Sequence, residues 1–244
     1  MKKSLVLLYG VITYIIFLIS FLYAIGFVGG FIVPKTINSG TVSAFIPSLI
    51  INLLLLSAFA IQHAIMARPA YKKWVSPVFC PAIERSTFVL LASLILLLIF
   101  WKWQPMTTII WNVENNILAS IFIGLSFFGW LIVLVSTFLI DHFELLGLKQ
   151  VFNNFKNKTT PNPQFKTNFL YKISRHPMML GFIIAFWSTP YMTSGHLLFA
   201  IVTTAYIFIA VKYLEEKDLR DSIGQKYEEY QKTVPMIIPF IKRK

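Results

Sequence analysis

The chain has 244 residues, of which 57% are hydrophobic and only 13% are charged, and its mean hydropathy is +0.69. A soluble domain of this length does not bury so much apolar sequence, so the composition indicates a polytopic membrane protein. The net charge of +12 is better explained by a basic membrane surface than by binding to nucleic acid. A single cysteine, Cys80, excludes an internal disulfide and a cysteine-based metal cluster.

Apolar segments alternate with short polar loops along the whole chain. The first follows Lys2 and Lys3, is too long for a signal-peptide core and lacks a small-residue cleavage site, so we expect it to be retained as a helix. The sequence predicts an all-α integral membrane protein, a bundle of five to six transmembrane helices in one polytopic domain, 1–244. The predicted membrane segments are 5–28, 44–66, 87–103, 118–140, 178–191 and 196–214.

Lysine and arginine residues predict the orientation of this bundle. With the N-terminus inside, the N-terminal tip, the loops 67–86 and 141–177 and the tail from Lys212 hold 2, 4, 6 and 8 basic residues, which is 20 of the 22. Only Lys35 and Lys102 lie elsewhere. Because basic residues favour cytoplasmic loops, both termini are expected to be cytoplasmic. Aromatic residues expected at the membrane interface end several segments: Trp101, Trp103, Trp111 and Tyr191.

The fifth segment, 178–191, is short. Its 14 residues would form about 21 Å of helix, less than the roughly 30 Å hydrocarbon core. Pro190 and Gly195 bracket a turn, so we expect a C-terminal helical hairpin with the last segment. The short segment is either a shallow or tilted half of that hairpin or a helix that extends back towards Tyr171. Its ends require cover by protein or a wet cavity, and a cofactor cavity is the favoured interpretation.

The tail from Glu215 onwards is predicted to be an amphipathic cytoplasmic helix. Its apolar residues recur at i, i+4, i+8 and i+11, a spacing that places them on one face against the membrane or the bundle. Pro235 ends this helix, and 236–241 is expected to fold back as an apolar lid. The expected flexible loop is 153–168. The residues of the apolar face are Leu219, Ile223, Tyr227 and Tyr230.

Two polar motifs flank the hairpin. Arg175-His176-Pro177 is either a helix start with interfacial cations or, with the free N–H groups after the proline, a site for an anionic group. Glu215 and Glu216 either form solvated pairs with Lys212 and Arg220 or hold a ribose hydroxyl, an amine or a sulfonium. Adjacent helical residues point about 100° apart, so we expect at most one glutamate to face a site.

Other polar residues lie at the ends of the predicted segments. Asp141 and His142 are either an interfacial cap or a general base, and both interpretations stay open. His63 is either an interhelical hydrogen-bonding residue or a substrate-site residue, and Glu84 and Arg85 are further substrate candidates. His196 is interpreted as interfacial. The four histidines lack ligand spacing, so no metal site is expected.

These motifs resemble a known superfamily. The spacing Arg175-His176-Pro177-x-x-x-Gly181, Glu215-Glu216-x-x-Leu219 and Gly224-x-x-Tyr227-x-x-Tyr230-x-x-x-Val234-Pro235 resembles the C-terminal half of the isoprenylcysteine carboxyl methyltransferases. The segments around Gln62-His63, Glu84-Arg85 and Asp141-His142 resemble the nurim-type branch, and with 187–200 they are similar to the bacterial methanethiol S-methyltransferases. The resemblance covers nearly the whole chain.

The resemblance implies an S-adenosylmethionine-binding half at 141–244. The positions that it implies for the cofactor are Tyr171, His176, Pro177, Met178, Met179, Gly181, Glu215, Glu216 and Tyr227. Met179 stands where the broader pattern has tyrosine. Val211 stands where the carboxyl methyltransferases have an arginine that suits a carboxylate substrate, which argues against a carboxylate acceptor here.

The leading hypothesis is direct methyl transfer from S-adenosylmethionine to methanethiol, giving dimethyl sulfide. Arg175 and either His142 or Asp141 are the candidate catalytic residues. The alternatives are another small thiol or lipid-like acceptor, a non-catalytic nurim-like scaffold, and a small transporter. The expected location is a bacterial inner membrane. The expected partners are a small thiol substrate and membrane lipid, and neither nucleic acid nor an obligate protein partner is expected.

Overall fold

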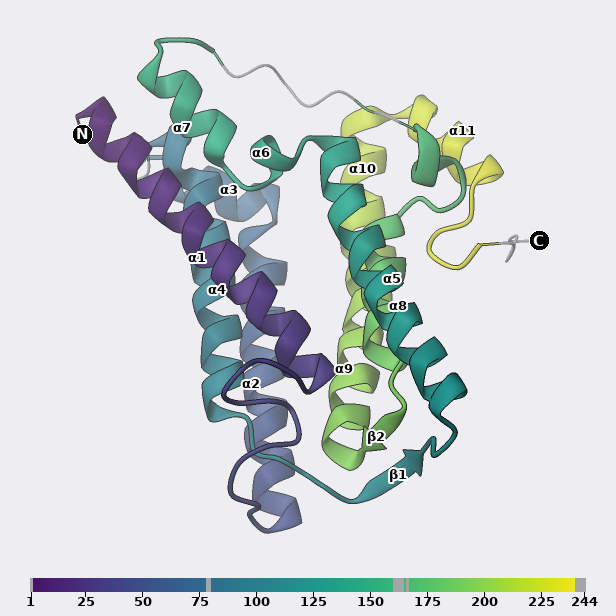
Figure 1. The fold of residues 1–244 in the computed structure, drawn as a ribbon. Coiled ribbons are helices and arrows are strands. Elements are labelled where there is room, and N and C mark those ends of the chain that lie inside the picture. The colour runs from purple at the N-terminus through teal and green to yellow at the C-terminus, as the bar shows by residue number, and fades with distance from the viewer. Residues whose placement is uncertain (1, 78–79, 160–164, 166, 240–244) are drawn as a thin grey trace. The chain divides into compact units, whose positions relative to one another are not determined.

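The protein is described by a computed structural model that covers residues 2–77, 80–159, 165 and 167–239. The chain divides into two compact units, Met1–Thr107 with Asp141–Asn162, and Thr108–Ile140 with Pro163–Lys244. Almost every element is helical (Figure 1). Five of the described helices are long and apolar enough to cross a membrane, which confirms the prediction of an all-α membrane bundle.

The first unit is built on three long helices, α1 (Lys3–Gly29), α2 (Phe45–Met66) and α4 (Pro81–Lys102). Aromatic stacking joins α1 to α4, with ring centroids 5.2 Å apart between Tyr23 and Phe100. The short helices α3 (Pro69–Val75), α6 (His142–Leu145) and α7 (Leu148–Phe155) complete the unit. A Cβ on Gly10 of α1 would overlap Val151 of α7, so this glycine lets α7 pack closely on α1.

Three sequence predictions for this unit are corrected. Helix α4 begins at Pro81 rather than at residue 87, because proline fits the first helical turn. Trp103 is fully buried and donates its indole N–H to the Ile37 carbonyl oxygen, so it is not an interfacial residue. The predicted loop 153–168 begins inside α7, which ends at Phe155, while 160–164 and 166 lie outside the described residues.

The second unit begins with strand β1 (Ile109–Asn112) and helix α5 (Asn116–Ile140). The 3₁₀ turn η1 (Phe169–Lys172), helix α8 (Pro177–Trp187) and strand β2 (Tyr191–Thr193) follow. Helix α9 (Ser194–Ala210) continues through a π-helical turn, η2 (Val211–Glu215), into α10 (Glu216–Ile223), and α11 (Gln225–Thr233) ends the helical tail.

Helix α8 is even shorter than predicted, with 11 residues. It packs backbone to backbone on α5, where a Cβ on Gly181 would lie 2.7 Å from the Gly129 carbonyl oxygen. Strand β2, which follows α8, pairs antiparallel with β1, which precedes α5. Helix α8 therefore runs back along α5 and ends near the N-terminus of α5 (Figure 1). Helix α9 starts at that point, as the predicted hairpin requires.

The tail differs from the predicted single helix. Gly224 has a φ of 70°, a left-handed value that glycine adopts without strain, and it separates α10 from α11. The predicted apolar residues pack on one another around this break, with Tyr227, Tyr230 and Val234 buried against Leu219 and Ile223. Beyond Pro235 the chain does fold back, because Ile237 is buried against Ile207 and Val211; residues 240 and 241 lie outside the described part.

Candidate active site

The second unit contains a buried ion pair between Arg175, just before α8, and Glu216, the first residue of α10. Arg175 Nε lies 2.8 Å from Glu216 Oε1, and Arg175 Nη2 lies 3.0 Å from Oε2. Both side chains are at most 6% exposed. A bidentate guanidinium–carboxylate pair is geometrically specific, so this contact fixes the start of α8 against the start of α10.

Glu216 accepts hydrogen bonds from three further side chains. His176 Nε2 lies 2.9 Å from Oε1, and the Tyr227 hydroxyl donates to the same oxygen at 2.9 Å. Gln231 Nε2 donates to Oε2. A carboxylate with two oxygens can satisfy about this many donors, so Glu216 is saturated by protein groups. The competing interpretation, pairing with Lys212 or Arg220, is wrong for Glu216 because its cation is Arg175.

His176 lies between the two adjacent glutamates. Its Nδ1 is 3.5 Å from Glu215 Oε2 and its Nε2 is 2.9 Å from Glu216 Oε1. Both carboxylates reach His176 although adjacent helical residues point about 100° apart, because Glu215 ends a π-helical turn, and such wide turns are frequent at functional sites. That at most one of the two glutamates faces a bound ligand stays a prediction.

This setting determines the charge of His176. Burial alone would lower its pKa, but the two carboxylates, Glu215 first, outweigh that cost and raise the pKa to about 9. His176 is therefore an imidazolium near neutral pH, and both ring nitrogens donate. Glu215 differs from Glu216 in exposure, because its side chain is 45% exposed whereas that of Glu216 is 4% exposed. The part of this cluster open to a ligand is thus Glu215.

Backbone hydrogen bonds from the tail complete the same cluster. The N–H groups of Arg175 and His176 donate to the carbonyl oxygens of Pro235 and Met236, at 3.0 and 3.1 Å. Arg175 Nη1 also donates to the carbonyl oxygens of Gln231 and Val234. Hydrogen bonds to main-chain carbonyl oxygens therefore hold the segment after α11 against the start of α8. No sequence motif predicts these contacts.

The remaining predicted cofactor residues lie around this cluster in the second unit. The Tyr171 carbonyl oxygen accepts a hydrogen bond from the Tyr230 hydroxyl. Pro177 begins α8, and Met179 packs on the apolar cluster of Ile207 and Val211. Gly181 faces α5, so close helix packing explains this glycine without a cofactor. Direct cofactor contact by these residues, and by Met178, remains a prediction.

The first unit contains a different polar cluster, centred on His142. This side chain is 95% buried, and its Nε2 lies 2.9 Å from the Tyr14 hydroxyl of α1. The Tyr14 and Phe143 rings meet the imidazole edge to face, with centroids 5.8 and 5.3 Å away. Burial lowers the pKa of His142, and the neighbouring Asp141 only partly opposes this. His142 is therefore neutral near pH 7 and able to accept a proton.

Asp141 has a structural role beside His142. Its side chain accepts the backbone N–H of Glu144 and caps α6. Lys149 of α7 bridges the two acids, with Nζ 2.5 Å from Asp141 Oδ2 and 2.9 Å from Glu144 Oε2. The interpretation as a helix cap therefore applies to Asp141, whereas the interpretation as a general base applies only to His142.

The predicted substrate residues also belong to the first unit. Arg85 donates from Nε to the Leu145 carbonyl oxygen at 2.6 Å and lies over the Phe88 ring. The His63 ring stacks on Phe59 and also contacts Phe88, with centroids 5.3 and 4.8 Å away. Glu84 pairs with Lys72 at 3.7 Å and lies in the first turn of α4 rather than before it.

His196 corrects another prediction. It is 1% exposed rather than interfacial, and its Nε2 lies 2.9 Å from the Phe186 carbonyl oxygen. Its backbone N–H is capped by Thr193 at the start of α9. This histidine therefore fastens α9 to the end of α8.

Sequence reasoning missed Tyr14 and Gln231. Gln231 lies four residues after Tyr227, so helical spacing places it on the same face, and that signal could have found it. Tyr14 stands in the first apolar segment, 128 residues from its partner His142, and no local pattern joins them. Among the described residues, no group of three His, Cys, Asp or Glu side chains could hold a metal ion.

Comparison with known proteins defines the class. A family model for phospholipid methyltransferases matches residues 125–226, which span α5 to the start of α11 and include Arg175, His176 and Glu216. Together with the five apolar helices and the curated relatives described next, this match identifies the protein as a multi-pass membrane methyltransferase. No solved structure matches the chain.

The curated relatives narrow the class. Methanethiol S-methyltransferase 1 of Bradyrhizobium diazoefficiens is 52% identical over 98% of this chain and 83% of its own length. The methanethiol S-methyltransferase of Mycobacterium tuberculosis is 45% identical over 98% of both chains. Mouse nurim is 29% identical over 72% of this chain and 70% of its own. The chain belongs to the methanethiol S-methyltransferase family, which confirms the resemblance drawn from its motifs.

Proposed function

We propose that this enzyme transfers the methyl group of S-adenosylmethionine to methanethiol and releases dimethyl sulfide. The observation that carries the proposal is the identity of 45–52% to methanethiol S-methyltransferases over nearly the whole chain. The sequence position of the site agrees with it, since the family match covers both halves of the Arg175–Glu216 pair.

The residues around His176 fit the proposed methyl donor. S-adenosylmethionine carries a carboxylate, an ammonium, a sulfonium and ribose hydroxyls. The half-exposed Glu215 carboxylate, held by the buried imidazolium of His176, suits the cations and hydroxyls, while the N–H groups at the start of α8 suit the carboxylate. These charges lie side by side in the second unit. Within the half 141–244 that the resemblance implies for the donor, the residues that we propose for it belong to the second unit, Pro163–Lys244, with Glu215 as the principal exposed contact.

Bound S-adenosylmethionine supplies an activated methyl group that a thiolate can displace in line. The protein then has to position the two reactants, exclude water and accept the thiol proton. Arg175, Glu216, Tyr227 and Gln231 hold His176 and Glu215 in place. We assign Arg175 to this positioning role, because its bonds go to Glu216 and to the tail backbone.

The acceptor side is proposed to be apolar. Val211 stands where the carboxyl methyltransferases carry arginine, and it is buried with Ile207 and Ile237. Met179 and Met236 pack on the same cluster. This wall offers no cation to a carboxylate and suits a small uncharged thiol that partitions into lipid.

We infer that His142 accepts the thiol proton. It is buried, and burial lowers its pKa, so the neutral imidazole is able to accept a proton; general-base catalysis contributes typically about 10²–10⁴-fold to a rate. His63, Glu84 and Arg85 belong to the same unit as His142 and are proposed as substrate-side residues.

We also propose that both termini are cytoplasmic, in a bacterial inner membrane. The distribution of basic residues supports this orientation. The short helix α8, counted with the five long ones, gives an even number of passes, as two termini on one side require.

Headspace gas chromatography on cells fed methanethiol tests the activity, and binding of S-adenosylmethionine to purified protein tests the site. Wild type should release dimethyl sulfide. Glu215→Ala should lose donor binding by at least tenfold, while Glu228→Ala, an exposed glutamate on α11, should bind normally. Donor binding without dimethyl sulfide would overturn methanethiol as the acceptor and point to another thiol or a lipid-like nucleophile. Absence of both would indicate a scaffold.

A further inference from the structure

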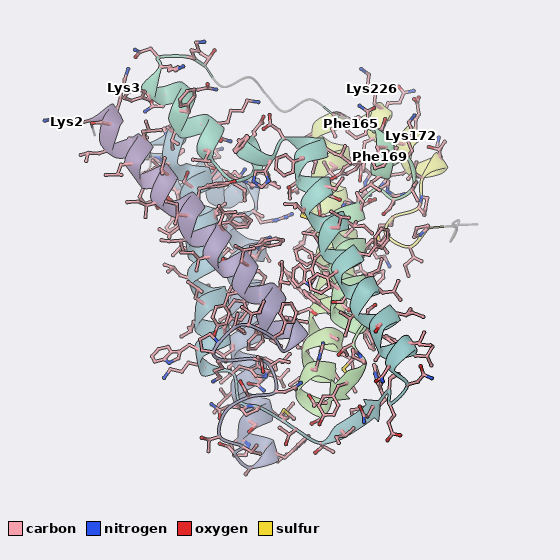
Figure 2. The ribbon with its side chains drawn as sticks, viewed as in Figure 1. Lys2, Lys3, Phe165, Phe169, Lys172 and Lys226 are labelled. Atoms are coloured by element: carbon pink, nitrogen blue, oxygen red, sulfur yellow. The ribbon has the colours of Figure 1, made fainter. Side chains whose placement is uncertain are left out.

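Four lysines of the first unit, two from the start of α1 and two from the segment after α7, lie close together. Lys3 begins α1 and Lys2 precedes it, while Lys156 and Lys158 follow α7. Lys3 Nζ contacts the Asn157 side-chain oxygen, which joins segments 154 residues apart. All four lysines are exposed, and Figure 2 shows Lys2 and Lys3 extending from the start of α1. We name Lys2, Lys3, Lys156 and Lys158 the lysine cluster.

No acidic side chain in the described part of the chain neutralises the lysine cluster. The acids of the same segment, Asp141 and Glu144, are both bound by Lys149. Lys156 instead lies over the Phe152 ring, with Nζ 4.5 Å from the centroid. Four positive charges therefore remain available at this surface.

Helix α7 adds an apolar component to the same surface. Its inner face is fixed to α1, because Val151 is fully buried against Gly10. On its outer face Phe152 and Phe155 are 47% and 44% exposed. An amphipathic helix with lysines beside exposed aromatic rings is typical of segments that lie at a membrane surface.

The position of Lys2 and Lys3 at the start of α1 indicates how deep the lysine cluster lies in the membrane. Helix α1 is long and apolar enough to cross a membrane, and Leu5 and Leu8, just after the two lysines, are 53% and 54% exposed. Exposed leucines next to lysines mark the change from hydrocarbon to headgroups at this end of the helix. The lysine cluster therefore lies at headgroup level, where anionic lipid phosphates are found.

We propose that the lysine cluster and the outer face of α7 form a binding site for anionic phospholipid headgroups. The lysines bind the phosphate groups, and Phe152 and Phe155 insert at the boundary of the acyl chains. This site is separate from the transferase residues, since none of its lysines or phenylalanines is among the side chains proposed to contact either reactant.

Reconstituted full-length protein tests the proposal. The amounts of phosphatidylglycerol and phosphatidylcholine retained from equimolar nanodiscs would be measured by native mass spectrometry. Wild type should retain phosphatidylglycerol preferentially. Because each lysine near a membrane surface contributes about 1 kcal/mol, Lys156→Gln/Lys158→Gln should bind this lipid about thirtyfold more weakly. Phe152→Ser/Phe155→Ser should weaken retention of both lipids.

The matched control is Lys217→Gln/Lys232→Gln, which removes two exposed lysines from α10 and α11 in the second unit. It should keep the wild-type preference. Equal loss in both double variants would show a general charge effect and overturn the site. Equal retention of the two lipids by wild type, or a thermal shift with inorganic phosphate as large as that with phosphatidylglycerol, would also overturn it.

Discussion

Two buried histidines in the two units of this protein differ in charge near neutral pH, because His176 is positively charged and His142 is neutral. His176 lies between two carboxylates, and its pKa is raised to about 9. His142 lies among a tyrosine hydroxyl and aromatic rings, and burial lowers its pKa. Burial opposes the charged form of both, so the difference comes from Glu215 and Glu216. The same residue type is thereby suited to bind an anion in one unit and to accept a proton in the other.

Removing Glu216 should have the largest effect on this comparison. In Glu216→Ala, the cations of Arg175 and His176 stay buried without their carboxylate, and breaking such a pair costs about 3–5 kcal/mol. We expect this loss in unfolding free energy and loss of S-adenosylmethionine binding. Thermal unfolding in detergent and a binding titration measure both. The control is Glu228→Ala, and equal stability of the two variants would contradict the central role of Glu216.

The pH dependence of stability should show the charge of His176. A pKa raised from 6.5 to about 9 stabilises the fold fully below pH 6.5, and this contribution is lost as the pH rises through 9. The full contribution is about 3 kcal/mol. Melting temperatures of wild type and His176→Gln should therefore differ most near pH 6 and converge above pH 9. A difference that grows with pH would reverse the assigned charge.

The opposite pH dependence is expected for His142. Its lowered pKa stabilises the fold above pH 6.5, and this contribution is lost as the pH falls below that value. In melting experiments the advantage of wild type over His142→Gln should shrink towards acid pH. The same variant should lower kcat about 100-fold while donor affinity is unchanged. An unchanged kcat would exclude His142 as the base.

Tyr14→Phe should have a smaller effect, since it removes one hydrogen bond to His142 and keeps the ring contacts. A loss of about 1 kcal/mol is expected. The pH profile of kcat should shift as well, because the hydroxyl contacts the imidazole directly. A stability loss without any shift of the pH profile would assign Tyr14 to packing alone.

The smallest effect is expected for Lys149→Ala. Lys149 bridges Asp141 and Glu144 near the surface, and hydrogen bonds to these acids raise its pKa. Exposed pairs contribute little, so neither melting temperature nor activity should change measurably at moderate salt. A large loss of activity would show that this bridge holds His142 in place.

Hydropathy was sufficient to predict the membrane helices, because it acts over whole segments; the orientation predicted from basic residues stays a prediction. Motif spacing also placed Arg175, His176 and Glu216 at one site, since a short hairpin separates them. It could not show that Glu216 is saturated by protein donors and that Glu215 is the exposed acid. That distinction depends on the wide turn at 211–215, for which the sequence carries no recognised signal.

Other errors share a physical cause, which is tertiary packing that overrides local pattern. Trp103 and His196 have the composition of interfacial residues, yet both are buried by partners far along the chain or across a turn. The tail looked like one helix because its apolar spacing continues through Gly224. The positive φ of that glycine redirects the same residues onto one another.

The close contact of Gly129 and Gly181 has a consequence for how the protein is made. Helix α8, with 11 residues, spans about 16 Å, which is too short for a segment to be stably inserted in a bilayer by itself. Of the segments that cover its apolar side chains, Ile207, Val211 and Ile237 follow α8 in the chain, whereas α5 precedes it and packs so closely that neither glycine tolerates a Cβ. We therefore expect α5 to act as the template on which α8 enters the membrane during biosynthesis. A bulky residue at either glycine would act at that stage, by lowering the yield of correctly inserted chains.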